Sequence, residues 1–144
     1  MSTRRESREC SLKMLYMFDN CKASIESVYR FFDGYFPKGK AYRVFAINLF
    51  EGVCENKEEI DSFINQYAKN WELDRMAVVD RNIIRLGIYE IMANQNTSIN
   101  IIIDEAVEIS KKYSTKDSGK FINGILDKLK FIRTHKDLRN CSLI

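Results

Sequence analysis

The chain has 144 residues, of which 45% are hydrophobic and 30% charged, with a formal net charge of +3. This length and composition predict one folded domain with its own core, and they exclude a disordered chain. The net charge is too small to identify a polyanionic partner by itself. The uninterrupted apolar runs are short, far below the roughly 20 residues that cross a bilayer, so we expect no membrane segment.

Cysteine and histidine usage restricts the chemistry of the protein. The four cysteines, at positions 10, 21, 54 and 141, form no C-x-x-C pair, which favours free thiols in a reducing cytoplasm. The single histidine, His135, excludes a metal site built on a histidine pair. A nucleophile at Cys10 or Cys54 would need that same histidine as its base. We therefore predict no metal, no cofactor and no enzymatic activity.

Apolar residues recur at helical spacing through the first half of the chain. A first helix has an apolar side that ends near Asp19, and Ser24 is the predicted N-cap of a second helix. Pro37 and Gly39 interrupt the pattern. Two further helices follow. The residues that mark these four apolar faces are Leu12, Leu15, Tyr16, Ile25, Val28, Phe32, Tyr35, Tyr42, Phe45, Ala46, Leu49, Val53, Ile60, Phe63, Ile64 and Tyr67.

The second half continues with three predicted helices. Asp74 is the predicted cap of a helix with two apolar sides, which indicates a central helix buried nearly all round. Another helix runs to Tyr113, and Ser114 and Asp117 have the spacing of a capping box for the last one. The residues that mark these apolar faces are Met76, Val79, Ile83, Ile84, Leu86, Ile88, Ile91, Ile102, Ala106, Ile109, Phe121, Ile122, Ile125, Leu129 and Ile132.

These elements predict an all-α protein with about seven helices, because no segment shows the alternation of a β-strand. One proline and six glycines leave long stretches without helix breakers. We expect a single helical domain over residues 1–136 and a frayed C-terminal tail over residues 137–144.

The charges are unevenly distributed along the chain. Residues 1–16 carry a net charge of +2, residues 111–144 a net +6, and residues 17–110 between them a net −5. Two basic ends predict a basic face for nucleic acid if the first and last helices pack side by side. Solvated surfaces and cations near helix ends would produce the same distribution without any ligand.

The first basic segment contains Arg4, Arg5 and Arg8, whose i,i+3 and i,i+4 spacing places them on one face of a helix. Arginine suits phosphate because its planar guanidinium binds bidentately and stays charged. The competing interpretation is a solvated chain terminus with no partner.

Four segments carry a more specific pattern. They are RRESRECSLKMLY (4–16), LFEGVCENKEEID (49–61), RMAVVDRNIIRLGIYEI (75–91) and IIIDEAVEISKKYSTKDSGKFINGILDK (101–128). They resemble, in the same order, the NusB family of bacterial transcription antitermination factors. The resemblance implies a compact bundle of seven helices in two subdomains. Family members often carry arginine where this chain has Glu6, a change that we expect to weaken phosphate binding.

The resemblance also implies a function. NusB proteins bind boxA, a short single-stranded RNA element of nascent ribosomal-operon transcripts, together with the small-subunit ribosomal protein NusE. The pair joins other factors on RNA polymerase and suppresses termination. We therefore expect an RNA-binding antitermination factor in the cytoplasm, without catalysis and without a membrane. Two alternatives stay open: a protein-interaction module whose RNA binding depends on its NusE-type partner, and a homodimer with a masked RNA face.

The resemblance strengthens the prediction that Arg4, Arg5 and Arg8 contact RNA phosphates. Tyr16 and Lys13 lie on the same predicted helix, so ring and cation would share an RNA groove with the arginines. A core position for Tyr16 and a solvated position for Lys13 are the alternatives.

The start of the last predicted helix forms the second part of the expected RNA site. Asp117, Ser118 and Lys120 lie there, where helix amides and a cation attract phosphate. Phe121 would stack on an unpaired base. Because Phe121 also continues the apolar stripe towards Ile125, a core position is the competing interpretation.

Asp80 and Arg81 interrupt the apolar pattern of the predicted central helix. The matching region of the family faces the NusE-type partner, so these two residues are the expected partner interface; a surface ion pair is the alternative. Asp104, Glu105 and Glu108 resemble a carboxylate metal cluster, but they lie early in a helix, where negative charge is favourable for another reason.

Overall fold

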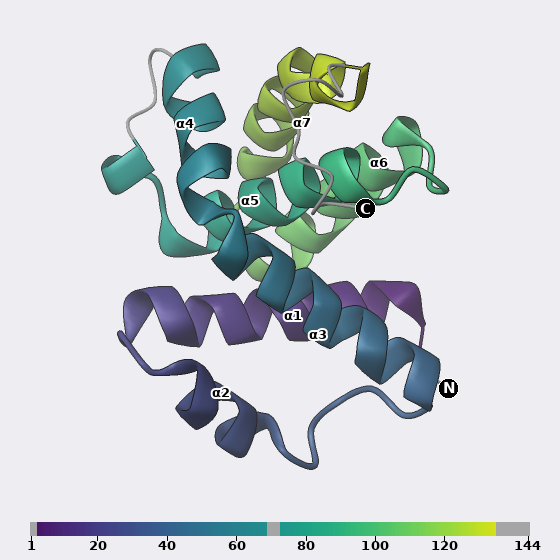
Figure 1. Ribbon diagram of the computed structural model, residues 1–144. Helices are drawn as coiled ribbons and strands as arrows, with labels where there is room; N and C mark the ends of the chain where they lie inside the picture. The colour runs from purple at the N-terminus through teal and green to yellow at the C-terminus, as the bar shows by residue number, and fades with distance from the viewer. Residues whose placement is uncertain (1–2, 69–72, 135–144) are drawn as a thin grey trace.

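A computed structural model of the protein describes residues 3–68 and 73–134. Within these ranges there are seven α-helices and no β-strand, which confirms the all-α prediction (Figure 1). His135 and the expected tail, 137–144, lie outside the described residues. The bounds are α1 Arg4–Asn20, α2 Ile25–Phe32, α3 Lys40–Glu55, α4 Lys57–Tyr67, the 3-10 helix η1 Leu73–Arg75, α5 Val78–Ala93, α6 Ile99–Tyr113, α7 Ser118–Leu129 and the 3-10 helix η2 Lys130–Thr134.

The helices fall into two groups, as expected for two subdomains. In Figure 1, α1, α2 and α3 form the lower half, and α4, α5, α6 and α7 form the upper half. The central helix α5 joins the halves, because it packs against α1 and α3 as well as α4, α6 and α7. The main neighbours of α1 are α2, α3, α5 and α6, whereas those of α7 are α4, α5 and α6. The first and last helices are therefore not side by side, and that part of the charge prediction is wrong.

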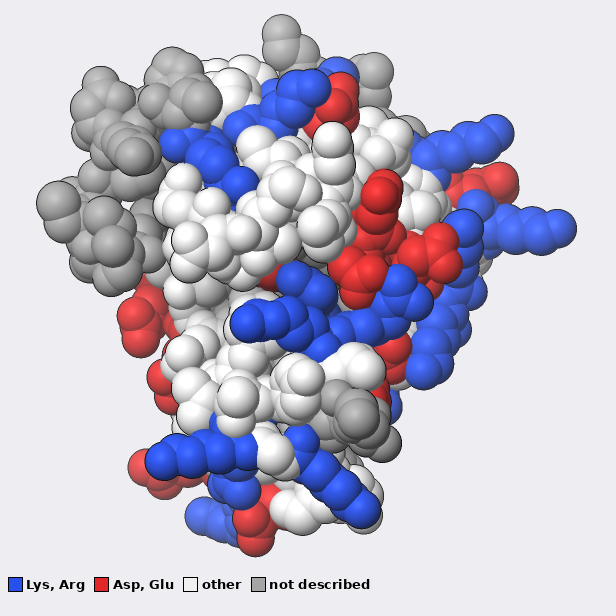
Figure 2. All heavy atoms as spheres, turned by 90° about the vertical axis from the view of Figure 1, so that its right-hand side faces the viewer, with Lys and Arg blue, Asp and Glu red and all other residues white. Residues whose placement is uncertain are grey.

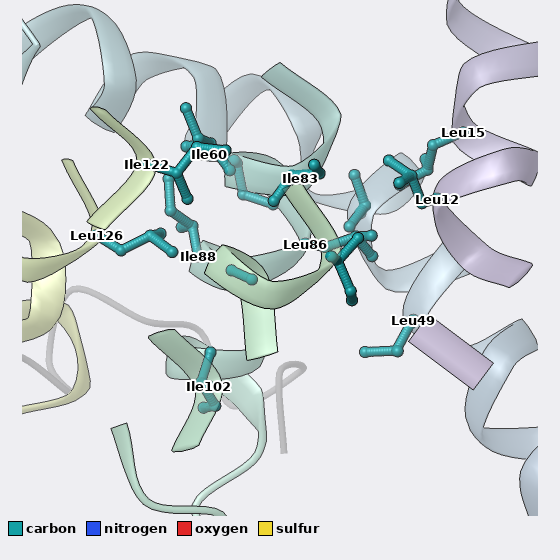
Figure 3. Packing of buried hydrophobic residues seen from close by; sticks show 14 of the residues in the cluster. Leu12, Leu15, Leu49, Ile60, Ile83, Leu86, Ile88, Ile102, Ile122 and Leu126 are labelled. Atoms are coloured by element: carbon teal, nitrogen blue, oxygen red, sulfur yellow. The ribbon is translucent and has the colours of Figure 1, made fainter. Parts of the chain in front are cut away.

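Burial of α5 on nearly all sides confirms its predicted central place. Every residue from Asn82 to Ile88 is buried, and so are Glu90, Ile91 and Met92. Figure 3 shows apolar side chains of α5 between those of α1 and α7. The labelled residues from these three helices are Leu12, Leu15, Ile83, Leu86, Ile88, Ile122 and Leu126.

Two glycines allow α5 to approach its neighbours closely. A Cβ atom on Gly52 of α3 would lie 2.0 Å from Cζ of Tyr89 on α5. A Cβ atom on Gly87 of α5 would lie 2.8 Å from a methyl carbon of Leu126 on α7. A side chain at either position would push the two helices apart, because interiors are already close-packed.

The helix starts agree with the sequence prediction in part. The Ser24 hydroxyl accepts a hydrogen bond from the amide of Ser27, as predicted for an N-cap. The capping box is wrong, since Asp117 makes no capping hydrogen bond through its side chain. The Asp74 cap is also wrong: this residue lies in η1, and α5 begins at Val78. Asp and Ser are favoured in tight turns as well as at caps, so the local sequence did not separate the two.

None of the helices in the described ranges is long and apolar enough to cross a membrane.

Candidate nucleic-acid interface

The arginine-rich segment forms the first turns of α1. The hydroxyl of Thr3 caps this helix by accepting a hydrogen bond from the amide of Glu6 at 3.1 Å. Arg4 and Arg5 are exposed in the first turn. Figure 2 shows this side of the molecule, where Lys and Arg side chains run across the middle of the surface with Asp and Glu beside them. The segment is therefore helical and positioned, in contrast to the solvated-terminus alternative.

Arg4 and Arg5 are held by side chains from two other helices. The guanidinium of Arg4 lies 4.6 Å from the ring centroid of Phe45 on α3, a cation–π distance. Arg5 binds the carboxylate of Glu105 on α6 bidentately, at 2.9 and 2.5 Å. The hydrogen bond from Arg5 lowers the pKa of Glu105. Both guanidinium groups stay near the surface, where a phosphate can reach them.

Arg8 differs from these two, and the expectation that it contacts phosphate is corrected here. It is only 5% exposed and binds the 2% exposed Glu90 of α5 through two hydrogen bonds, at 2.6 and 2.9 Å. Burial alone would lower the pKa of the Arg8 guanidinium, but the hydrogen bond and charge of Glu90 outweigh it and raise that pKa. One turn of helix separates Arg8 from Arg4, yet the side chain joins α1 to α5 inside the protein.

The middle of α1 contacts the end of α6. Glu9 accepts hydrogen bonds from Lys112 at 2.8 Å and Tyr113 at 2.7 Å. Burial would raise the pKa of Glu9, but these hydrogen bonds and the lysine charges lower it overall. The ammonium of Lys13 lies 5.6 Å from the ring centroid of Tyr113. Tyr16 is 40% exposed, so its core alternative is not supported. Lys13 and Tyr16 therefore extend the exposed surface of Arg4 and Arg5 along α1.

The start of α7 is anchored by α5. The Asp80 carboxylate accepts hydrogen bonds from the hydroxyls of Ser114, at 2.6 Å, and Ser118, at 3.0 Å. Ser118 is buried, so its expected RNA contact is corrected: the hydroxyl is used inside the protein. Asp117 and Lys120 are exposed. Phe121 is half-buried and packs against the core cluster, which supports its core position, and its stacking on a base stays a prediction.

Asp80 and Arg81 were expected at a partner interface, and both are used in internal contacts. The half-buried Asp80 anchors α7, as described above. Arg81 donates to both carboxylate oxygens of Asp19 on α1, at 2.8 and 3.0 Å. The carboxylates of α6 that resemble a metal cluster are used in ion pairs, because Glu105 binds Arg5 and Glu108 binds Lys111 at 2.7 Å.

Sequence reasoning missed that residues 30–43 add basic charge beside α1. They carry more basic than acidic residues, but the acidic balance of residues 17–110 concealed them. Their position in the fold brings them beside α1, since α2 packs on α1 and Lys38 and Lys13 line the same groove. A shorter window in the charge count would have found this signal.

Comparison with known proteins agrees with this architecture. The model of the NusB family matches residues 5–131. The chain belongs to the NusB family. It is 44% identical over 129 residues to the transcription antitermination protein NusB of Trichlorobacter lovleyi, covering 90% of this chain and 91% of that protein. It is 41% identical over 130 residues to the NusB of Geobacter sulfurreducens, covering 90% of this chain and 94% of that one.

Solved NusB structures have the same fold. A structure of T. maritima NusB superposes with a TM-score of 0.83 at 34% identity, covering 94% of this chain and 96% of that chain. A crystal structure of the antitermination factors NusB and NusE in complex with double-stranded RNA gives a TM-score of 0.80 at 26% identity. It covers 88% of this chain and 95% of that chain.

Proposed function

We propose that this NusB-family protein is a transcription antitermination factor that binds boxA-type single-stranded RNA of nascent ribosomal-operon transcripts. It does so together with a NusE-type ribosomal protein, within the antitermination complex on RNA polymerase. Family membership supports this role, as does a relative of known structure that was crystallised with NusE and RNA. The role requires positioning of RNA and protein, not catalysis, and its place is the cytoplasm, where transcripts emerge.

The observation that carries the proposal is the first turn of α1. Thr3 caps the helix, Phe45 and Glu105 hold the two guanidinium groups, and both groups stay exposed. Arginine side chains that are pre-positioned in this way lose less conformational freedom when they bind a phosphate. Lys13 and Tyr16 on the same helix offer a further cation and an aromatic ring.

Replacement of Arg4 and Arg5 by alanine is expected to weaken binding of a boxA-type RNA by about tenfold. It should also lower the slope of log K against log salt by roughly 0.7 for each phosphate that is no longer neutralised. Fluorescence anisotropy across a salt series measures both quantities. The matched control is Arg75→Ala with Lys128→Ala, which removes two exposed cations elsewhere. Equal affinity and slope in the Arg4/Arg5 variant and the control would refute the role of the first turn.

Glu6 is expected to oppose RNA binding, because its exposed carboxylate lies in the same turn as Arg4 and Arg5. Glu6→Gln removes a charge that repels phosphate while keeping the shape of the side chain. At surface separations of a few ångströms this repulsion is on the order of 1 kcal/mol or less in water, so the affinity for RNA should rise about threefold. The dissociation constant of the same RNA at low salt is the measurement. Weaker binding by Glu6→Gln would mean that Glu6 helps to hold the RNA.

The contribution of the protein partner is tested by titrating labelled boxA-type RNA with and without the NusE-type protein. Binding that is equally tight without the partner identifies this chain as the main RNA reader. Binding seen only with the partner identifies it as an interaction module. Sedimentation across a concentration series tests the homodimer alternative, which a constant monomer mass would exclude.

A further inference from the structure

A groove lies between α1 and the segment that joins α2 to α3. Its volume is about 710 Å³. One wall is the side of α1 that carries Glu6, Cys10 and Lys13, and the other wall is aromatic. The complete lining is Glu6, Glu9, Cys10, Lys13, Phe31, Phe32, Tyr35, Phe36, Pro37 and Lys38. The groove therefore begins on the same helix as Arg4 and Arg5 and continues away from them.

Two aromatic rings of this groove are exposed to an unusual degree. Phe31 is 61% exposed and Tyr35 is 75% exposed. Their ring planes are nearly parallel, at 20°, with centroids 6.4 Å apart. Phe31 also makes an edge contact with the buried Phe32, at 5.3 Å between centroids. The pair is thus anchored to the core at one end and presents flat aromatic faces to solvent at the other.

Three cations lie in or beside the groove. Lys13 and Lys38 line the groove, and the guanidinium of Arg43 lies 4.7 Å from the ring centroid of Phe36. Of the two acidic residues in the lining, Glu9 already binds Lys112 and Tyr113. Glu6 is the acidic residue that weakens the basic character of the groove. Cations and exposed rings in one groove form the combination that binds single-stranded nucleic acid, where bases stack and phosphates follow the basic groove.

We propose that this groove binds unpaired bases of the RNA that runs on from Arg4 and Arg5, with Phe31 and Tyr35 as the stacking surface. The inference rests on the proposed function and adds a second contact region to it. One wall is α1 and the other is the end of α2 with the turns that follow it, so the described lining offers no β-strand edge on which an extended peptide could form main-chain hydrogen bonds. The positive residues of segment 30–43 favour a polyanion over a basic protein partner.

The test uses a boxA-type RNA and the same RNA lengthened at one end or the other by about eight unpaired nucleotides, within the site size of single-strand binders. Phe31→Ala with Tyr35→Ala should weaken binding of one of the lengthened RNAs by about tenfold or more. Phe31→Tyr with Tyr35→Phe keeps both rings and should leave binding unchanged. Photo-crosslinking of 4-thiouridine in the added nucleotides to the unmodified protein gives a second readout, with the label expected on Phe31 or Tyr35.

The outcomes separate the two proposals. If the alanine variant binds every RNA as the unmodified protein does, and crosslinks lie elsewhere, the groove assignment is refuted while the role of Arg4 and Arg5 stands. If the unmodified protein binds no RNA with or without the NusE-type partner, the proposed function itself fails. If the alanine variant keeps RNA binding but loses the partner, or changes from dimer to monomer, the groove binds protein and the assignment is likewise refuted.

Discussion

Replacement of Arg8 by alanine is expected to lower the free energy of unfolding by about 3–5 kcal/mol. The change removes one member of a buried ion pair and leaves the carboxylate of Glu90, which is 2% exposed, without its guanidinium. A buried charge without its partner is far more costly than an exposed one. The decrease is a large part of the roughly 5–15 kcal/mol by which domains are stable, so the variant should unfold at much lower urea concentration.

Arg5→Ala is the matched control for this prediction. It removes an arginine–glutamate pair of the same helix, but Arg5 is largely exposed, so the decrease should be at most about 1 kcal/mol. A second variant, Arg8→Met with Glu90→Leu, replaces the whole pair by apolar side chains and should recover most of the stability. Normal stability of Arg8→Ala together with a reduced salt slope of RNA binding would instead assign Arg8 to phosphate contact.

Replacement of Asp19 by alanine is expected to lower the free energy of unfolding by about 3 kcal/mol. The Asp19 carboxylate accepts hydrogen bonds from Arg81 at 2.8 and 3.0 Å, from Asn82 at 3.0 Å and from Arg85 at 2.9 Å. Arg85 is buried and keeps a second partner in Asp61, at 2.8 Å, which limits the decrease. Urea unfolding measures the effect, and Asp127→Ala, which breaks an exposed pair with Lys130, should cost little.

The same carboxylate makes stability depend on pH. Burial would raise the pKa of Asp19, but hydrogen bonds from Arg81 and Asn82 and the charge of Arg85 hold it far below its ordinary value. In the unfolded chain this group takes up a proton near about pH 3.9, while the folded protein still holds it ionised. Stability from Asp19 is therefore complete above about pH 5 and falls as the pH drops through about 4.

Asp19→Asn removes this titration, so the difference in unfolding free energy between the two proteins should shrink from about pH 7 to about pH 3. Glu9 and Glu105, whose pKa values are also lowered, act in the same direction in both proteins and cancel in the difference. A difference that stays constant over this range would contradict the assigned role of Asp19.

These two ion-pair networks also explain how the candidate RNA surface is positioned. Arg8 near the start of α1 meets Glu90 near the end of α5, and Asp19 near the end of α1 meets Arg81 near the start of α5. The two helices therefore run antiparallel and are joined at both ends. The first turn of α1, with Arg4 and Arg5, is fixed relative to the core by this pairing.

The sequence alone determined the number of helices, the central place of α5 and the family. Helical periodicity is a local property, and a helix that is apolar on two sides has to be buried wherever it lies. The family was recognised from four motifs in the same order between residues 4 and 128, a pattern that helical spacing alone does not produce. The Ser24 N-cap was predictable from the sequence because the cap depends only on residues of the same turn.

Only the tertiary structure decided which of these side chains are available to a ligand. Arg4, Arg5 and Arg8 are equivalent by spacing, but Glu90, 82 positions along the chain from Arg8, holds Arg8 in the interior. Asp80 likewise binds Ser114, 34 positions away. Packing brings such partners together, so they cannot be predicted from the charges or the spacing of residues within one segment. The distribution of charge along the chain therefore pointed to basic segments, and the fold showed which cations lie on the surface.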